Sequence, residues 1–329
     1  MRLYDSFIER DLEAIPPAGL EFRRDHSSEE LWQAVTRFAI LAYAPSQHAK
    51  HALFSCLAAW DLRDVLGSRF DEMVTQCAVY AASSRQPWSE PPILDPPPVD
   101  ANAPRDANEL RQAIAGGDRL RAERWLAARF QDPDFAADFF AVASEDFEDL
   151  GHKLIAAVTA FRLAALLGEK GRFAALRVGI WEMVASRGAT SSRESADVDP
   201  SSLATRLVQQ MVAQRGEVVA AHRLFLLDSA LQTEDAAVLA QACSSLQAEV
   251  DAEPPPPEPA QDPGTTASGQ ASGDIQVYAL ARDYGELLKS CAVARRLRER
   301  FPSIGAMRII DAARDHLANA PSSDEFTFA

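Results

Sequence analysis

The sequence predicts an all-α protein in which helical hairpins repeat and pack together as one multi-helix domain. Alanine is abundant and alternating runs of β-branched residues are scarce, which favours helices over strands. The long apolar segments recur with the roughly 3.6-residue period of an α-helix. With 329 residues, 47% of them hydrophobic, the chain is long enough to bury one large core or two modest ones. A recurring pattern of residues further indicates a repeat architecture.

The recurring pattern begins with histidine and ends with glycine. In 51–67 and again in 152–168, Leu stands two positions after the His, Ala eight positions after it and an aromatic residue nine positions after it. The aromatic residue is Trp60 in the first copy and Phe161 in the second. Another apolar segment with helical spacing follows each closing glycine. Each copy therefore predicts a hairpin that consists of a long helix, a glycine turn and a second helix.

Two further copies of the pattern are weaker. The third begins at His222 and keeps Leu224 and Ala230 at matching positions. The fourth, around 283–297, matches the second copy at several positions but has Glu286 where the other copies have His. The series His, His, His and Glu at equivalent helix positions suggests a common site where the helices meet.

Proline and polar residues delimit the helices that precede the first copy. Residues 1–20 predict one short amphipathic helix that ends at Pro16 and Pro17. Ser27 and Glu30 form a capping box, which predicts the start of the next helix. That helix is expected to stop at Pro45, and Ser46 to cap the first helix of the repeat.

Loops and helices alternate in the centre of the chain. Residues 87–105 contain too many prolines for a helix and predict a loop that crosses the surface. Residues 106–147 predict two helices and the start of a third, and 188–199 predict a polar loop. Asp199 and Pro200 then begin another helix, with Asp at the cap and Pro in the first turn.

We expect a helical repeat domain over 1–250, a linker over 251–274 and C-terminal helices over 275–329. The linker is acidic, low in complexity and rich in proline, so we expect it to be disordered. Because the fourth copy matches the second, the C-terminal helices are expected to pack back on the same domain. The alternative is that these helices form a separate appendage.

The composition restricts the partners and the location of the protein. The formal net charge of −15 argues against nucleic acid and anionic membranes as partners, because both require clustered Lys and Arg. No apolar run approaches the roughly 20 residues of a membrane span, and the charged N-terminus is not a signal peptide. The cysteines are dispersed without C-x-x-C spacing, which predicts buried free thiols in a reducing compartment. We therefore expect a cytoplasmic protein.

Three histidines, His51, His152 and His222, stand at equivalent positions of the repeat. Hairpins that repeat can point such positions at a common centre. Imidazole nitrogens bind Fe, Zn and Cu, so three converging rings predict a metal site. The alternative is that each His makes a hydrogen bond within a packed core. His48 shares a helix face with His51 and is a further candidate ligand, unless it is simply solvated.

Glu286 and Lys289 offer donors of a different kind. Glu286 is a candidate carboxylate ligand. Lys289 lies in an otherwise apolar run, where burial favours the neutral amine. A neutral lysine can react with carbon dioxide to give a carbamate, which is an anionic oxygen ligand. The alternative is an ordinary salt bridge of Lys289 with Glu286 or with a neighbour.

Parts of the sequence resemble the questin oxidase-like family. The matching segments are QHAKHALFSCLAAW at 47–60, LGHKLIAAVTAFRL at 150–163 and DYGELLKSCAVARRL at 283–297, with a shorter one at His222. The last of the three is similar to a late family motif, in which a His and a Lys three residues on precede a short apolar stretch. The resemblance implies a mononuclear non-haem iron held by several His and a carboxylated Lys. It also implies oxidation or cleavage of anthraquinone-type polyketide rings with dioxygen.

The resemblance assigns roles to particular positions of this chain. The histidines that begin the first three copies fall on His-ligand positions, and Lys289 falls on the carboxylated Lys. The chain departs from the family at Glu286, where the family motif has His, and it lacks a second His near His222. Glu286 or His48 could supply the missing ligand.

Two functional hypotheses follow. The first is an iron-dependent oxygenase that acts on a small aromatic substrate with dioxygen, in a pocket walled by Trp60, Phe161 and apolar neighbours. The second is a metal-free helical scaffold or interaction protein that has lost the site, and the missing histidine favours it. The sequence has no Gly-rich phosphate loop, no G-x-S-x-G and no H-E-x-x-H motif, so a Rossmann-type nicotinamide or flavin site is not predicted.

Overall fold

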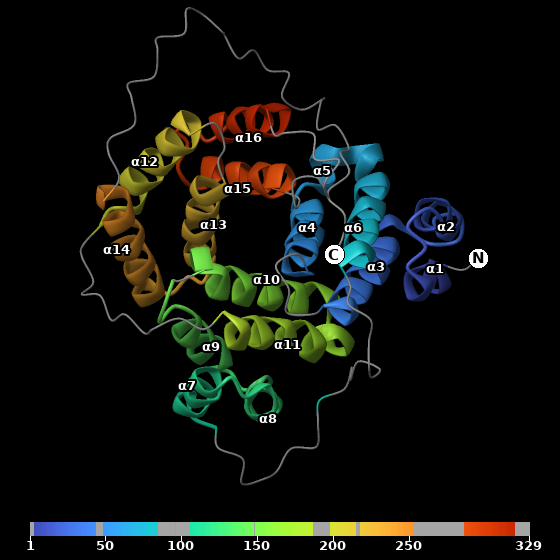
Figure 1. Cartoon of the computed structure of the whole chain (residues 1–329), viewed down its shortest axis with the longest axis horizontal. Helices are drawn as coiled ribbons and strands as arrows, with labels where there is room; N and C mark the ends of the chain where they lie inside the picture. Colours follow the sequence, from blue (N-terminus) through green and yellow to red (C-terminus); the bar gives the residue numbers. More distant parts are fainter. Residues whose placement is uncertain are drawn as a thin grey trace, which may run out of the picture.

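The chain folds into helices that share one continuous hydrophobic core (Figure 1). The computed structural model describes residues 3–43, 49–84, 96, 105–147, 149–186, 198–214, 218–252 and 286–319. These residues contain no strand, which confirms the predicted all-α, multi-helix domain. The four cysteines are buried in it as free thiols, as predicted.

The described residues lie mostly in α-helices. Those of the first half are α1 (Leu3–Glu9), α2 (Ile15–Phe22), α3 (Ser28–Ala42), α4 (Ala49–Asp61), α5 (Arg63–Leu66), α6 (Phe70–Ser84), α7 (Ala107–Gly116), α8 (Arg119–Arg129) and α9 (Phe135–Ala143). Those of the second half are α10 (His152–Leu167), α11 (Glu169–Ala185), α12 (Pro200–Ala213), α13 (Val218–Gln232), α14 (Ala236–Ala252), α15 (Glu286–Arg300) and α16 (Arg308–Asn319). Two short 3-10 helices are η1 (Gly67–Arg69) and η2 (Asp149–Gly151).

The N-terminal segment holds two helices where the sequence predicted one. α1 ends at Glu9, and the positive φ of Arg10, 56°, turns the chain away from the helix. α2 begins at Ile15, so Pro16 and Pro17 lie in its first turn. Proline is tolerated there because the first N–H groups of a helix have no partner within it. The expectation that the two prolines end a helix is therefore wrong.

Two predicted helix starts are confirmed. The Ser27 side chain accepts a hydrogen bond from the Glu30 N–H, and the Glu30 carboxylate accepts one from the Ser27 N–H. Asp199 caps α12 by accepting a hydrogen bond from the Ser202 N–H at 2.9 Å, with Pro200 in the first turn. Each cap satisfies N–H groups that the helix itself leaves without acceptors.

The four copies of the repeat fold as four hairpins of packed helices. The pairs are α4 with α6, α10 with α11, α13 with α14 and α15 with α16. Gly67 and Gly168 have positive φ angles of 53° and 68°, which suits glycine at the turns of the first two hairpins. In each pair the first helix lies toward the centre of the molecule and the second lies outside it (Figure 1).

The first helices of the four hairpins form a closed ring (Figure 1). α4 contacts α10 and α15, and α13 contacts the same two helices. All residues that line the central cavity stand 3, 6, 7 or 10 positions after His51, His152, His222 or Glu286. Steps of three and four residues stay on one face of a helix, so each helix presents the same face to the centre. The fourth copy therefore has the same register as the other three.

Ion pairs close one end of the ring. Arg162 donates two hydrogen bonds to Asp61, at 2.9 and 2.6 Å. Arg296 contacts the same Asp61 carboxylate and donates to Asp228 at 2.6 and 3.0 Å. The four side chains come from α4, α10, α13 and α15, so the cluster links the whole ring.

One stretch of the chain resembles a membrane span. Asp149–Leu167, which comprises η2 and α10, is long and apolar enough to cross a membrane, so the expectation that no stretch approaches a span was too strict. However, 72% of its apolar window is buried inside the fold. α10 packs against α4, α9, α11 and α13, so its apolar composition is explained by its place in the core.

Several predicted segments lie largely outside the described residues. Of the predicted linker, 251–274, the structure describes Asp251 and Ala252, which end α14. Of the predicted loops 87–105 and 188–199, it describes the residues at 96, 105, 198 and 199. Within 275–329, α15 packs against α4 and α13, and α16 packs against α12 and α15.

Replacement of Arg296 by Met is predicted to lower the free energy of unfolding by about 3 kcal/mol. The change leaves Asp228 and Asp61, whose side chains are 5% and 12% exposed, without the guanidinium that they share. Urea denaturation followed by circular dichroism measures the loss. Arg206→Met is the control, because the Arg206 pair with Asp251 is at the surface and contributes less than about 1 kcal/mol. Equal losses in both variants would contradict a structural role for the ion-pair cluster.

Candidate metal centre

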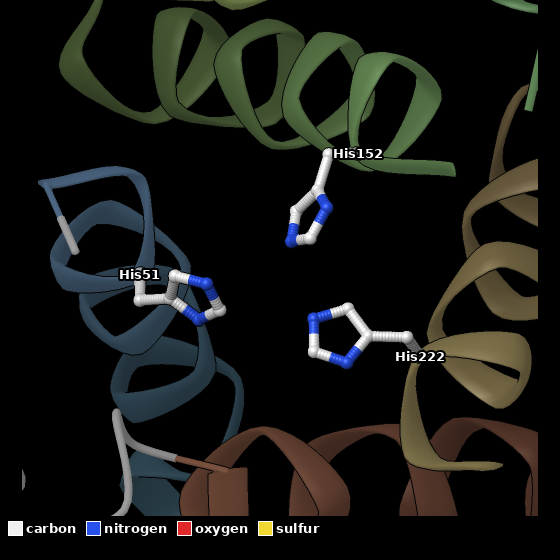
Figure 2. A group of neighbouring side chains, drawn as sticks. All are labelled: His51, His152 and His222. Carbon is white, nitrogen blue, oxygen red and sulfur yellow. The ribbon is translucent and has the colours of Figure 1, made fainter. Parts of the chain in front are cut away.

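Three histidine side chains meet near the other end of the ring (Figure 2). His51 lies in the first turn of α4, His152 is the first residue of α10, and His222 lies in the second turn of α13. All three are buried, with 8%, 4% and 2% of their surface exposed. Their rings point toward one centre, and one nitrogen of each lies within 4.8 Å of the others. The structure thus brings the three predicted histidines together in one buried cluster.

The spacing of the cluster is close to that of a metal site. Nitrogens bound at about 2.1 Å to one ion lie roughly 3–3.5 Å from one another. The separation of up to 4.8 Å exceeds this by roughly 1.3–1.8 Å. Rotations of the imidazole rings about their side-chain torsions can close such a gap.

Burial keeps two of the imidazoles in the neutral form. It lowers the pKa of His222 to about 4, with the charge of Lys289 adding to the effect and Glu286 opposing it. Burial and the charge of Lys289 also lower the pKa of His51 well below its usual range. The neutral imidazole is the form that binds metal ions, so the environment suits ligation at neutral pH.

The hydrogen bonds of His152 and His222 leave one ring nitrogen of each for a ligand. The Nδ1–H of His222 donates to the carbonyl of Val218 at 2.8 Å, and that of His152 donates to the carbonyl of Asp149. Each neutral ring then has a lone pair on Nε2. Both Nε2 atoms are buried and have no hydrogen-bond partner among the described residues. Buried nitrogens without partners are unusual, and a metal ion would satisfy both.

His51 is held by the fourth copy of the repeat. Lys289 Nζ lies 2.7 Å from the Nδ1 of His51, and Glu286 Oε1 lies 3.3 Å from the same nitrogen. Lys289 and Glu286 also form the buried salt bridge that the sequence offers as the alternative to a carbamate. Burial raises the pKa of Glu286, but Lys289, His222 and His51 outweigh it and hold the pKa below its usual range. Glu286 is therefore a carboxylate, and its Oε2 is buried without a hydrogen-bond partner among the described residues.

The two predicted pocket residues, Trp60 and Phe161, lie away from the histidines. His48 is outside the described residues. Trp60 packs on Trp32, with ring centres 4.4 Å apart, and Phe161 packs on Phe140, with ring centres 5.2 Å apart. Each of the two predicted pocket residues stands nine positions after the histidine of its copy, and nine steps of about 100° lead to the opposite face of a helix. Neither residue therefore lines the cavity inside the ring.

A small cavity begins directly beneath the histidines. Its end nearest the histidines is lined by the residues that stand three positions after the first residue of each copy, Phe54, Ile155, Phe225 and Lys289. Its volume is about 50 Å³, which holds one or two small molecules such as water or dioxygen. Sites for larger organic ligands measure roughly 300 Å³ or more. An aromatic ring system therefore does not fit inside the closed ring.

A wider hollow lies on the outer face of α10. It has a volume of about 530 Å³ and is bordered by Phe161, Phe130 and Arg172. None of the three clustered histidines lines it. The sequence predicted one pocket that is beside the histidines and large enough for an aromatic substrate. In the structure the cavity beside the histidines is small, and the large hollow is remote from them.

Sequence reasoning missed two charged residues beside the histidines. Asp149 Oδ2 lies 3.4 Å from the Nδ1 of His152, and Lys50 Nζ lies 3.0 Å from the same Asp149 oxygen. Asp149 precedes His152 by three positions, and Lys50 precedes His51 by one. The available signal was that each of them stands close in the sequence to a candidate ligand. Spacing within one helix does not reveal that the two charged side chains meet.

Comparison with known proteins adds no relative. No protein-family model matches the chain, and neither the curated proteins nor the solved structures contain a match.

The stability of the metal-free protein is predicted to fall as the pH is lowered from 6.5 to about 4, in part through His222. In this range the unfolded chain binds a proton at His222 and the folded chain does not, so acid favours unfolding; above it both forms are neutral. The contribution is roughly 2–4 kcal/mol. Urea denaturation at pH 7.5, 5.5 and 4.5, which spans most of this range, measures it.

The variant His222→Gln lacks this proton and should lose less stability over the same range. His26→Gln is the matched control, because His26 stacks on Phe22 away from the cluster. An identical pH dependence in the wild type and His222→Gln would show that burial does not depress protonation of His222.

Proposed function

We propose that the chain binds one divalent transition-metal ion through His51, His152 and His222. The observation that carries the proposal is that His152 and His222 both have a buried Nε2 without a hydrogen-bond partner among the described residues, within one histidine cluster. An unsatisfied buried polar group costs roughly 1–3 kcal/mol, which two bonds to an ion would offset.

Glu286 is the fourth ligand in this proposal. Its carboxylate lies 3.3 Å from His51, and its Oε2 has no hydrogen-bond partner among the described residues. Imidazole and carboxylate donors together suit iron, manganese and zinc, and non-haem iron sites combine the two while leaving positions open. We favour iron because segments of the sequence resemble the questin oxidase-like family.

We further propose that the protein oxidises or cleaves a small aromatic, polyketide-type molecule with dioxygen. The same resemblance motivates this choice. In a balanced ring cleavage one carbon–carbon bond breaks and both atoms of dioxygen are added to the substrate, so no further reductant is consumed. When bound, iron supplies the redox chemistry that lets dioxygen react with an aromatic ring.

The chain's own side chains would hold the ligands and exclude water. Phe54, Ile155 and Phe225 form an apolar layer beneath the histidines. The cavity of about 50 Å³ has room for dioxygen but not for an aromatic ring. The aromatic substrate would therefore approach the histidines from outside this cavity.

Carboxylation of Lys289 stays part of the proposal as a state that competes with its salt bridge. A carbamate forms from the neutral amine, whereas the buried pair with Glu286 stabilises the ammonium. The free cysteines support a cytoplasmic location, which is a reducing compartment.

A metal-free scaffold or interaction protein is the second candidate, and Lys289 favours it. Its ammonium lies 2.7 Å from His51, where a positive charge opposes the binding of a cation. In this alternative the ion pair with Glu286 has replaced the metal as the group that organises the fourth copy.

The wild-type protein, purified without chelator or a nickel column, is predicted to hold about one equivalent of metal after anaerobic reconstitution with iron. His152→Ala and His222→Ala should reduce this to less than about a tenth, because each removes a ligand. Inductively coupled plasma mass spectrometry measures the metal, and His26→Ala is the control. A wild type with less than about a tenth of an equivalent of iron, zinc or manganese would favour the scaffold.

The iron-loaded protein is predicted to take up dioxygen when it is given hydroxylated anthraquinones. An oxygen electrode measures uptake, and mass spectrometry with isotopically labelled dioxygen shows whether both atoms enter a cleaved product. His222→Ala should show no substrate-dependent uptake. A wild type that holds iron and yet consumes no dioxygen with any member of the panel would refute the oxygenase and leave the metal site standing.

A further inference from the structure

A second polar cluster, in which Lys50 and Glu182 are buried and the Asp149 side chain is 49% exposed, lies beside the histidines and supplies none of the proposed ligands. Lys50 Nζ lies 2.9 Å from Glu182 Oε1 and 3.0 Å from Asp149 Oδ2. Tyr43 donates a hydrogen bond to Glu182, and Ser186 donates one to Asp149 at 3.2 Å. These residues come from the ends of α3 and α11, the start of α4 and η2. The cluster therefore joins four separate segments where α10 begins.

Asp149 contacts His152 through two groups. Its backbone carbonyl accepts a hydrogen bond from the Nδ1–H of His152, and its carboxylate Oδ2 lies 3.4 Å from the same nitrogen. Lys50 holds that carboxylate, and His51 follows Lys50 directly in the chain. The cluster thus contacts His152 directly and includes the residue that precedes His51.

The turn that presents Asp149 has a strained backbone. Asp149, Leu150 and Gly151 all have positive φ angles, of 50°, 58° and 75°. The left-handed conformation costs roughly 1–2 kcal/mol for a residue with a side chain, and it persists only where surrounding contacts impose it. A Cβ on Gly151 would lie 2.8 Å from the side chain of Leu226, on α13. The turn is therefore held between the cluster on one side and the helix of His222 on the other.

The charges of the cluster suit a role in ligand positioning. Lys50 and Glu182 are 7% and 2% exposed, and an apolar pair would be buried at lower cost. Two carboxylates share one ammonium, so negative charge is in excess near the Nδ1–H of His152. A carboxylate behind a ligating imidazole keeps the proton on Nδ1, orients the ring and strengthens the other nitrogen as a donor.

We propose that Asp149, held by Lys50 and Glu182, is a positioning residue that fixes the tautomer and orientation of His152 so that Nε2 faces the metal. This role rests on the proposed metal site. Its first consequence, the tautomer of His152, exists without metal and can be observed separately.

The test compares the full-length wild type with Asp149→Asn. Asparagine also tolerates a positive φ, so the turn can persist while the charge is removed. Nitrogen NMR of labelled histidine should show His152 protonated at Nδ1 in the metal-free wild type and a smaller fraction of this tautomer in the variant, which keeps the backbone carbonyl of residue 149 but loses the carboxylate. The affinity for cobalt(II), used as the probe, should fall about 10- to 100-fold. Asp134→Asn is the matched control, because Asp134 also forms an ion pair, with Arg129, far from the site.

Two further variants address the support of Asp149. Lys50→Met should weaken cobalt(II) binding to a similar extent, and Lys50→Arg, which keeps the charge, should restore most of it. If Asp149→Asn does not fold, the wild-type spectrum still decides, since a His152 protonated at Nε2 would overturn the proposal.

The outcomes separate this proposal from the metal site itself. A wild type that binds cobalt(II), with affinity and tautomer unchanged in Asp149→Asn, would overturn the positioning role and leave the metal site intact. A wild type that binds no cobalt(II) refutes the metal site, and with it the positioning of Nε2 toward a metal. A tautomer shift together with weaker binding supports both.

Discussion

A polar side chain that is buried inside the ring of α4, α10, α13 and α15 loses its water and depends on partners at its own level. The four helices share one register, so their polar residues fall into layers. Three histidines and Glu286 form one layer, Asp61, Arg162, Asp228 and Arg296 form another, and mostly apolar positions lie between them. The rest of the fold is arranged to keep these layers aligned, with the second helix of each hairpin packed outside the ring.

The layered ring is the part of the structure that the sequence specified best. The recurrence of His and Glu at equivalent positions predicted both the hairpins and the register, because spacing along a helix determines which face a residue occupies. The same rule places Trp60 and Phe161 on the outer face, where they pack against other helices, although their recurrence suggested a pocket. Lys50 and Asp149 stand 99 positions apart, and no local pattern could bring them together. Their contact depends on how whole helices pack.

The two halves of the histidine layer differ in how fully their hydrogen bonds are satisfied. On the side of α15, Lys289 and Glu286 pair with each other and with His51, so that side is organised without an ion. On the side of α10 and α13, His152 and His222 each keep a buried nitrogen without a hydrogen-bond partner among the described residues. A cation would be stabilised by the nitrogens on the side of α10 and α13. It would be repelled by the ammonium of Lys289 on the side of α15. The balance between them decides between an enzyme and a scaffold.

The contact that completes the ring joins the first copy of the repeat to the last. His51 and Lys289 stand 238 positions apart in the chain. During synthesis the histidines of the first three copies are therefore made long before the helix that closes the ring leaves the ribosome. Contacts of such long range also form late in folding, because loop closure has to precede them. The nascent protein thus passes through a stage in which its histidines are open to the surrounding solution, and any ion that they hold can be acquired then.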